Sequence, residues 1–162
     1  MMSFGEAIRV CLKEKFATFS GRACRSEYWW FVLFNFLIGV VTSILDAILG
    51  TEILLGTDRY GNPKILGIIT TIVALGLLVP WFAVYFRRLH DRNKSGWYGF
   101  LPLILIIAGA IFSGVPILAL ILLVAGLGFG VYTFVMTVLK GDNGRNDYGP
   151  DPLNPNSNSS IF

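Results

Sequence analysis

Four long apolar runs, separated by polar loops, constrain this chain more than any other feature. They cover approximately residues 29–49, 65–86, 97–112 and 115–139. A helix needs about 20 apolar residues to cross the ~30 Å hydrocarbon core of a bilayer. In lipid every backbone polar group must be bonded within its own segment, so runs of this length predict helices. We therefore predict an all-α polytopic membrane protein, a bundle of four transmembrane helices.

The stretch of residues 97–139 allows more than one interpretation. Ser113, Gly114 and Pro116 interrupt it, and Gly and Pro typically mark turns. The stretch is about twice as long as a single crossing requires, which favours two crossings. One long kinked helix, or a re-entrant hairpin followed by one span, are the alternatives.

Composition leaves no room for a separate soluble domain. Of 162 residues, 54% are hydrophobic and only 14% are charged, against about 25% charged residues in a typical soluble domain. We predict a single membrane domain over residues 1–152. Residues 153–162 are rich in Asn, Pro and Ser and are expected to form a disordered tail.

The basic residues are distributed unequally between the two sides of the membrane. Of the 13 Lys and Arg residues, only Arg59 and Lys64 fall in the loops assigned to the outer side. The positive-inside rule then places both termini in the cytoplasm. Nucleic-acid binding would need a continuous basic patch, so we interpret the net charge of +3 as an orientation signal.

The first 20 residues predict an amphipathic helix. Ser3 and Glu6 form the S-x-x-E pattern of a capping box. Apolar side chains then recur at helical spacing, at Phe4, Ile8, Cys11, Leu12, Phe16 and Phe19. This pattern is typical of a helix that lies in the membrane interface, and it also fits a helix packed under the cytoplasmic rim of the bundle. Ser20 and Gly21 are expected to end it.

Several residues in or beside the apolar runs have expected packing roles. Trp29, Trp30 and Trp97 are interpreted as interfacial anchors, and Pro80 is expected to kink the second span. Gly126 and Gly130 form a G-x-x-x-G pattern, which allows close packing within the chain or against a second copy.

Ionisable groups are scarce inside the runs. Asp46 is the only carboxylate there, and it lies near the expected outer end of its run, within reach of water. A water-accessible path lined by Asn35, Thr42 and Asp46 would favour a small transporter or pore, which is the alternative function. Cys11 and Cys24 are expected to be free thiols, with too few neighbouring ligands for a metal and no sign of a cofactor.

Polar residues concentrate in three strings that the topology brings to the cytoplasmic face, over residues 19–29, 87–97 and 140–152. Seven residues of the first two strings form what we call the collar: Arg22, Arg25, Glu27, Arg87, Arg88, His90 and Asp91. Opposite charges crowd together there, so we expect Arg22 or Arg25 to contact Asp91 or Glu27.

In order and composition the three strings resemble the bacterial inner-membrane family called domain of unknown function 805, the YhaH-like proteins. The resemblance covers about residues 1–152, and residues 101–123 look expanded relative to shorter members. It implies a small inner (plasma) membrane protein with no agreed biochemical activity.

Three roles for the collar compete. It could interlock the cytoplasmic strings through salt bridges, or its arginines could bind anionic phospholipid headgroups or an acidic segment of a membrane protein partner. In the enzymatic role, His90 would act as a general base and Asp91 would orient its ring. Neighbouring residues on a helix point about 100° apart, however, and no nucleophile accompanies this pair. We therefore expect a non-enzymatic protein bound to the bilayer, alone or as a homo-oligomer.

Overall fold

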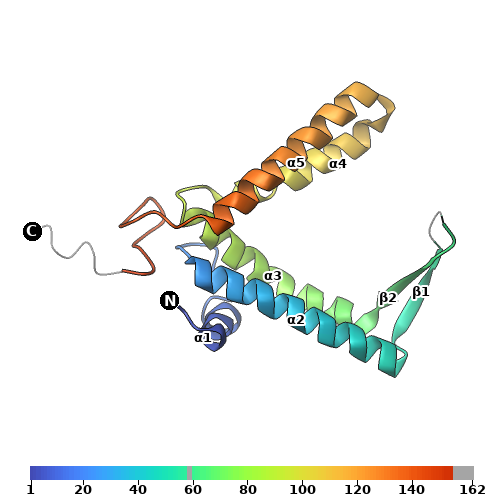
Figure 1. Ribbon diagram of the computed structural model, residues 1–162, viewed down its shortest axis with the longest axis horizontal. Coiled ribbons are helices and arrows are strands. Elements are labelled where there is room, and N and C mark those ends of the chain that lie inside the picture. Colours follow the sequence, from blue (N-terminus) through green and yellow to red (C-terminus); the bar gives the residue numbers. More distant parts are fainter. Residues whose placement is uncertain (58–59, 155–162) are drawn as a thin grey trace, which may run out of the picture.

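The protein folds into two helical hairpins that diverge from one end. A computed structural model describes residues 1–57 and 60–154, and it is mostly helical. Its regular elements are α1 (Phe4–Arg9), α2 (Arg25–Leu49), β1 (Glu52–Thr57), β2 (Pro63–Gly67), α3 (Ile68–His90), α4 (Leu101–Ile111) and α5 (Pro116–Val138). Figure 1 shows α2 paired with α3 and α4 paired with α5, with the two pairs splayed apart like the arms of a V.

Among the described residues, three helices are long and apolar enough to cross a membrane: α2, α3 and α5. The shorter apolar helix α4 lies between short 3-10 turns at Gly96–Gly99 and Phe112–Gly114. The second turn falls where the sequence predicted one, so residues 97–139 form a hairpin and not one long kinked helix. Helix α3 is continuous through Pro80.

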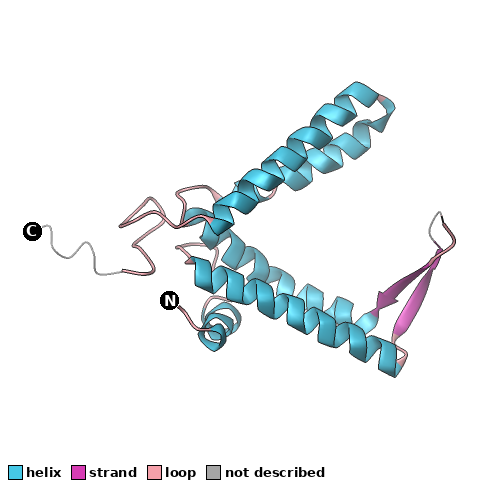
Figure 2. Cartoon of the chain, viewed as in Figure 1, coloured by secondary structure: helices cyan, strands magenta, loops and turns pink. Residues whose placement is uncertain are grey.

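The segment between α2 and α3 differs from the all-α prediction. Here β1 and β2 form an antiparallel hairpin (Figure 2). Ile53 pairs with Leu66 and Leu54 with Ile65, so apolar residues on both sides of the turn form the ladder. Because these strands extend to Gly67, the second span begins at Ile68 and not at residue 65. Arg59, one of the two basic residues predicted for this loop, lies outside the described residues.

The N-terminal segment is helical over a shorter range than predicted. Both bonds of the capping box between Ser3 and Glu6 are present. Helix α1 passes into a π-helical turn, Val10–Glu14, and the helix ends there, before Phe16 and Phe19. The chain then turns back because residue 23 must reach α3, where the Ala23 amide donates to the Arg87 carbonyl at 2.9 Å.

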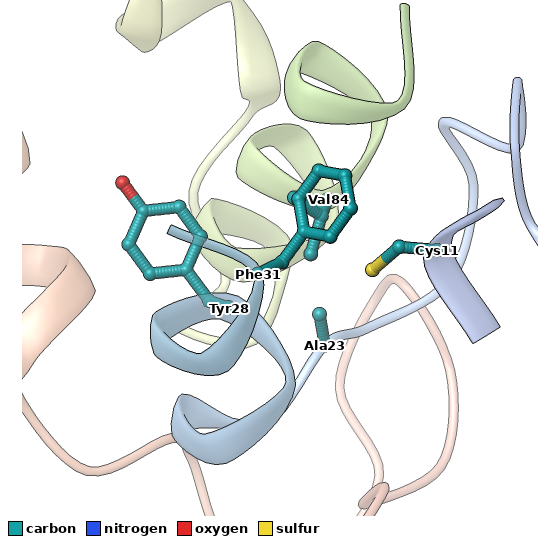
Figure 3. Close-up of a cluster of buried hydrophobic side chains, with 5 residues drawn as sticks. All are labelled: Cys11, Ala23, Tyr28, Phe31 and Val84. Carbon is teal, nitrogen blue, oxygen red and sulfur yellow. The ribbon is translucent and has the colours of Figure 1, made fainter. Parts of the chain in front are cut away.

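The buried core lies at the end where the hairpins meet. It consists of five side chains that come from the N-terminal segment, the start of α2 and the end of α3: Cys11, Ala23, Tyr28, Phe31 and Val84 (Figure 3). Farther along both arms most large apolar side chains are exposed, as expected for helices that face lipid.

Glycine in α5 allows α4 to pack closely against it. A Cβ atom on Gly126 would lie 2.9 Å from Cγ1 of Ile106 and 3.1 Å from the Pro102 carbonyl oxygen. On Gly130 it would lie 3.9 Å from Cβ of Pro102. In this chain the G-x-x-x-G face is therefore occupied by α4.

Candidate functional site

The three polar strings meet at the closed end of the V. Backbone hydrogen bonds connect them directly: the Ala23 amide donates to Arg87, and the Asp142 amide donates to Asp91 at 2.8 Å. The start of α2, the end of α3 and the segment after α5 therefore lie at one end of the molecule (Figure 1).

Asp91 lies at the centre of this junction. Arg22 donates from Nε to Oδ1 at 2.9 Å, and Arg88 donates from Nη1 to Oδ2. All three residues are buried. Burial raises the pKa of the Asp91 carboxyl above its ordinary value, and the charges of Arg88 and Arg22 oppose that rise. Both oxygens accept a hydrogen bond from a cation, which is the arrangement that a carboxylate requires.

Gly141 makes room for Asp91. A Cβ atom at this position would lie 2.0 Å from Oδ2 of Asp91, so any other residue would displace the carboxylate or the chain. The sequence offered a signal for this residue, because Gly141 belongs to the third string. Its contact with Asp91 depends on the path of the chain after α5.

Arg87 forms a second buried ion pair, with Glu27. Within the described part of the chain, Nε and Nη2 of Arg87 have no hydrogen-bond partner. Cys11 packs nearby, and burial raises the pKa of its thiol to about 12, so the thiol stays protonated at neutral pH. Cys24 is also free and buried.

Backbone carbonyls accept most of the remaining arginine hydrogen bonds. Arg22 donates to the carbonyls of Gly144 at 2.5 Å and Gly149 at 3.3 Å. Arg88 donates from Nε to the Thr137 carbonyl at 3.0 Å, and from Nη2 to the Leu139 carbonyl. Thr137 and Leu139 lie at the C-terminal end of α5, where unpaired carbonyls carry a partial negative charge. The buried positive charge is therefore balanced partly by the end of a helix.

His90 packs against the third string and contacts the first. Its ring stacks on Tyr148 with centroids 3.8 Å apart and planes inclined by 6°. Nδ1 lies 3.1 Å from the Gly21 carbonyl, which can only accept, so Nδ1 carries a proton. Among the described residues no hydrogen bond joins the His90 ring to Asp91.

Every collar residue except Arg25 contacts another string. Arg25 is exposed on the wall of a pocket at the start of α2. Residues 25 and 27 are separated by about 200° around a helix, so Glu27 faces inward toward Arg87 while Arg25 faces outward.

Asp46, at the other end of α2, is placed differently from its prediction. Its place in the sequence put it within reach of water, but it is only 1% exposed. Its two carboxylate oxygens accept hydrogen bonds from the amides of Ile69 and Thr70, each at 2.9 Å, and Oδ1 also accepts from the Thr51 hydroxyl. Gly67 has no capping side chain of its own, so Asp46 caps α3 from the neighbouring helix.

The other polar residues of this path bond to their own helix. Asn35 donates to the Phe31 carbonyl at 2.8 Å, and Thr42 donates to Gly39 at 3.1 Å. Across residues 1–57 and 60–154, no group of three His, Cys, Asp or Glu side chains is placed to hold a metal ion.

Comparisons with known proteins point to one family. A family model described as "Protein of unknown function (DUF805)" matches residues 16–150. The chain is similar to the inner membrane protein YhaH of Escherichia coli K12, with 34% identity over 86% of this chain and 90% of that protein. It is also similar to the inner membrane protein YhaI of the same strain, with 30% identity over 86% and 89% of the two chains. No solved structure matches.

Proposed function

Because the chain belongs to the DUF805 family, whose relatives YhaH and YhaI are inner membrane proteins, we propose that it is a non-enzymatic multi-pass inner-membrane protein whose collar locks three cytoplasmic segments together. The locked collar would also present positive charge to an anionic lipid or to a membrane protein partner at the headgroup level. Residues 1–152 act as one membrane domain in this proposal.

One observation supports the lock above all others. Arg22 and Arg88 come from different strings and share the Asp91 carboxylate. Arg22 extends its remaining donors to carbonyls of the third string, and Arg88 extends its own to carbonyls at the C-terminal end of α5. Guanidiniums and carboxylates buried in this way are costly unless nearly every donor and acceptor is bonded. A site built for chemistry would keep a reactive group accessible, whereas the ring of His90 is stacked and its Nδ1 is bonded.

We further propose four crossings, with both termini in the cytoplasm. The chain leaves the collar at Asp91 and returns to it at Asp142, so it must turn back in between. Helix α5 is long enough to cross the bilayer. The helical stretch of residues 96–114 is roughly 30 Å long at α-helical and 3-10 rises, which suffices for the outward crossing. In this arrangement α1 lies at the cytoplasmic interface beside Trp30, against which Phe4 packs with ring centroids 5.7 Å apart.

Replacement of Asp91 tests the lock. We expect Asp91→Ala to lower the yield of monodisperse protein in detergent more than His90→Ala does. Without Asp91 the charges of Arg22 and Arg88 are packed together unpaired, and loss of one partner of a buried ion pair costs roughly 3–5 kcal/mol. His90→Ala removes only a stacking contact and one hydrogen bond. A wild-type yield for Asp91→Ala would refute the lock.

The alternative, a small transporter or pore, lacks a supporting observation. Asn35 and Thr42 bond to their own helix, and Asp46 caps α3. Each of the side chains that would line such a path therefore has a local structural partner.

A further inference from the structure

A pocket of about 520 Å³ opens where α2 begins and α5 ends. Its walls are of two kinds. Charged and polar groups lie on the side of the collar, and apolar side chains lie on the side of the helical arms. The residues that matter below are Arg25, Lys140, Asp151, Trp30, Leu33 and Val138.

Two cations on the polar wall are not used by the fold. Arg25 and Lys140 are both exposed. Over residues 1–57 and 60–154, neither side chain forms an ion pair or a hydrogen bond. Arg22, Arg87 and Arg88, by contrast, are buried and each is bonded to a carboxylate. Arg25 and Lys140 are thus available to an external anion.

The start of α2 also contributes positive electrostatic potential to the pocket. Cys24 precedes the helix and provides no side-chain cap, and both Cys24 and Ser26 line the pocket. The first amides of this 25-residue helix therefore carry a partial positive charge at the pocket wall. Phosphate is the anion that such a helix end binds most readily, because several N–H groups converge on it.

The apolar wall continues onto the lipid-facing surface. Trp30, Leu33 and Val138 are 38%, 39% and 44% exposed. Trp29 Nε1 donates to the Thr137 carbonyl at 3.2 Å, which holds α2 and α5 together beneath the pocket. A ligand with a charged head and an apolar tail would match both walls at once.

The carboxylates on the wall do not cancel this charge. Both oxygens of Asp91 are bonded to arginines. Asp151 accepts the Leu153 amide at 2.9 Å and is half-buried. Two free cations and a helix N-terminus therefore face one carboxylate.

We propose that this pocket binds a bilayer phospholipid of net negative charge, with its phosphate between Arg25 and Lys140 and an acyl chain along Trp30 and Leu33. The inference rests on the proposed function in one respect, namely that the collar faces the cytoplasmic leaflet. It adds a defined ligand class and a defined position.

Titration of short-chain phosphatidylglycerol onto the purified full chain in detergent, followed by native mass spectrometry, tests the proposal. We expect the double variant Arg25→Gln/Lys140→Gln to bind about 30-fold more weakly, because each surface cation contributes roughly a factor of five. The control variant Lys13→Gln/Arg145→Gln removes the same charge from exposed residues outside the pocket. It should bind like the wild type. Asp151→Asn should strengthen binding.

Two results would overturn the proposal. Equal weakening in both double variants would mean unspecific attraction, and inorganic phosphate competing at the same concentration as the lipid would mean a site for free phosphate. Failure here is distinguishable from failure of the lock, because Arg25 and Lys140 make no side-chain bonds in the collar, so the yield should stay at the wild-type level. If the double variant folds poorly, Lys140→Gln alone should weaken binding about fivefold, and unchanged binding would refute the site.

Discussion

At the scale of single residues, Asp46 shows how a carboxylate becomes acceptable within an apolar helix. Its oxygens bond two amides at the start of α3 and the Thr51 hydroxyl, while Gly67 lets the chain approach. A Cβ atom on Gly67 would lie 2.3 Å from Oδ2 of Asp46. The residue therefore fixes the end of the α2–α3 hairpin that lies farthest from the collar (Figure 1).

We expect Asp46→Ala to lower the free energy of unfolding by about 1–2 kcal/mol, the usual effect of losing a helix cap. Ser43→Ala is a matched control, because Ser43 is exposed on the same helix. It should change the free energy by less than about 0.5 kcal/mol. Unfolding by SDS titration in mixed micelles measures both. Equal stability of the two variants would contradict the capping role.

The sequence predicted which charged residues form the collar better than it predicted the groups to which each of them bonds. The charges beside the apolar runs were enough to expect that Arg22 or Arg25 contacts Asp91 or Glu27, and Arg22 does contact Asp91. The carbonyl partners of Arg88 and the outward direction of Arg25 were not predictable, because they depend on where α2 and α5 begin and end. Helix α2 begins at Arg25, four residues before the apolar run. The angular position of each residue around the helix axis then decides which side chain faces inward.

At the scale of elements, the two helices of the α4–α5 hairpin approach closely at glycines, of which Gly126 is one. A Cβ atom on Gly126 would have backbone and side-chain atoms of α4 within 3.3 Å, whereas one on Gly128, two residues later, would have nothing within 4 Å. The two glycines belong to the same helix and differ only in the face that they occupy. Substitutions at these two positions therefore distinguish the effect of helix packing on stability from the effect of helix propensity.

We expect Gly126→Ala to lower the free energy of unfolding by roughly 1–3 kcal/mol, the cost of overpacking. Gly128→Ala should be neutral or stabilising by up to about 1 kcal/mol, because Ala is the better helix former. SDS titration again provides the measurement. A Gly126→Ala variant as stable as Gly128→Ala would show that α4 and α5 pack more loosely than the structure has them.

The elements that the sequence missed are those decided by tertiary contacts. The strands β1 and β2 satisfy each other's backbone groups, and neither has the alternating pattern of a half-buried strand. The N-terminal helix ends early because the chain must return to Arg87. The long helices α2, α3 and α5 were predicted because apolar length alone determines them.

At the scale of the whole molecule, the collar is where the two hairpins are joined. Beyond it the arms diverge (Figure 1). Their exposed apolar side chains face the surrounding medium. Apolar runs and charge asymmetry predict how often the chain crosses the bilayer and in which direction. They contain no information on the angle between the arms, which depends on packing at the collar.

The four-span topology predicts where single cysteines can be labelled. In a background with Cys11→Ala and Cys24→Ser, a membrane-impermeant maleimide should label Ser113→Cys in intact cells, because the proposed topology places the turn between α4 and α5 on the outer side. Ser159→Cys, outside the described residues, should be labelled only after permeabilisation, because the proposed orientation places 11 of the 13 basic residues on the cytoplasmic side. Labelling of Ser159→Cys from outside would reverse the orientation. Protection of Ser113→Cys together with Ser159→Cys would instead mean that α4 and α5 enter and leave the bilayer from the cytoplasmic face, with the collar unchanged and the count of spans reduced.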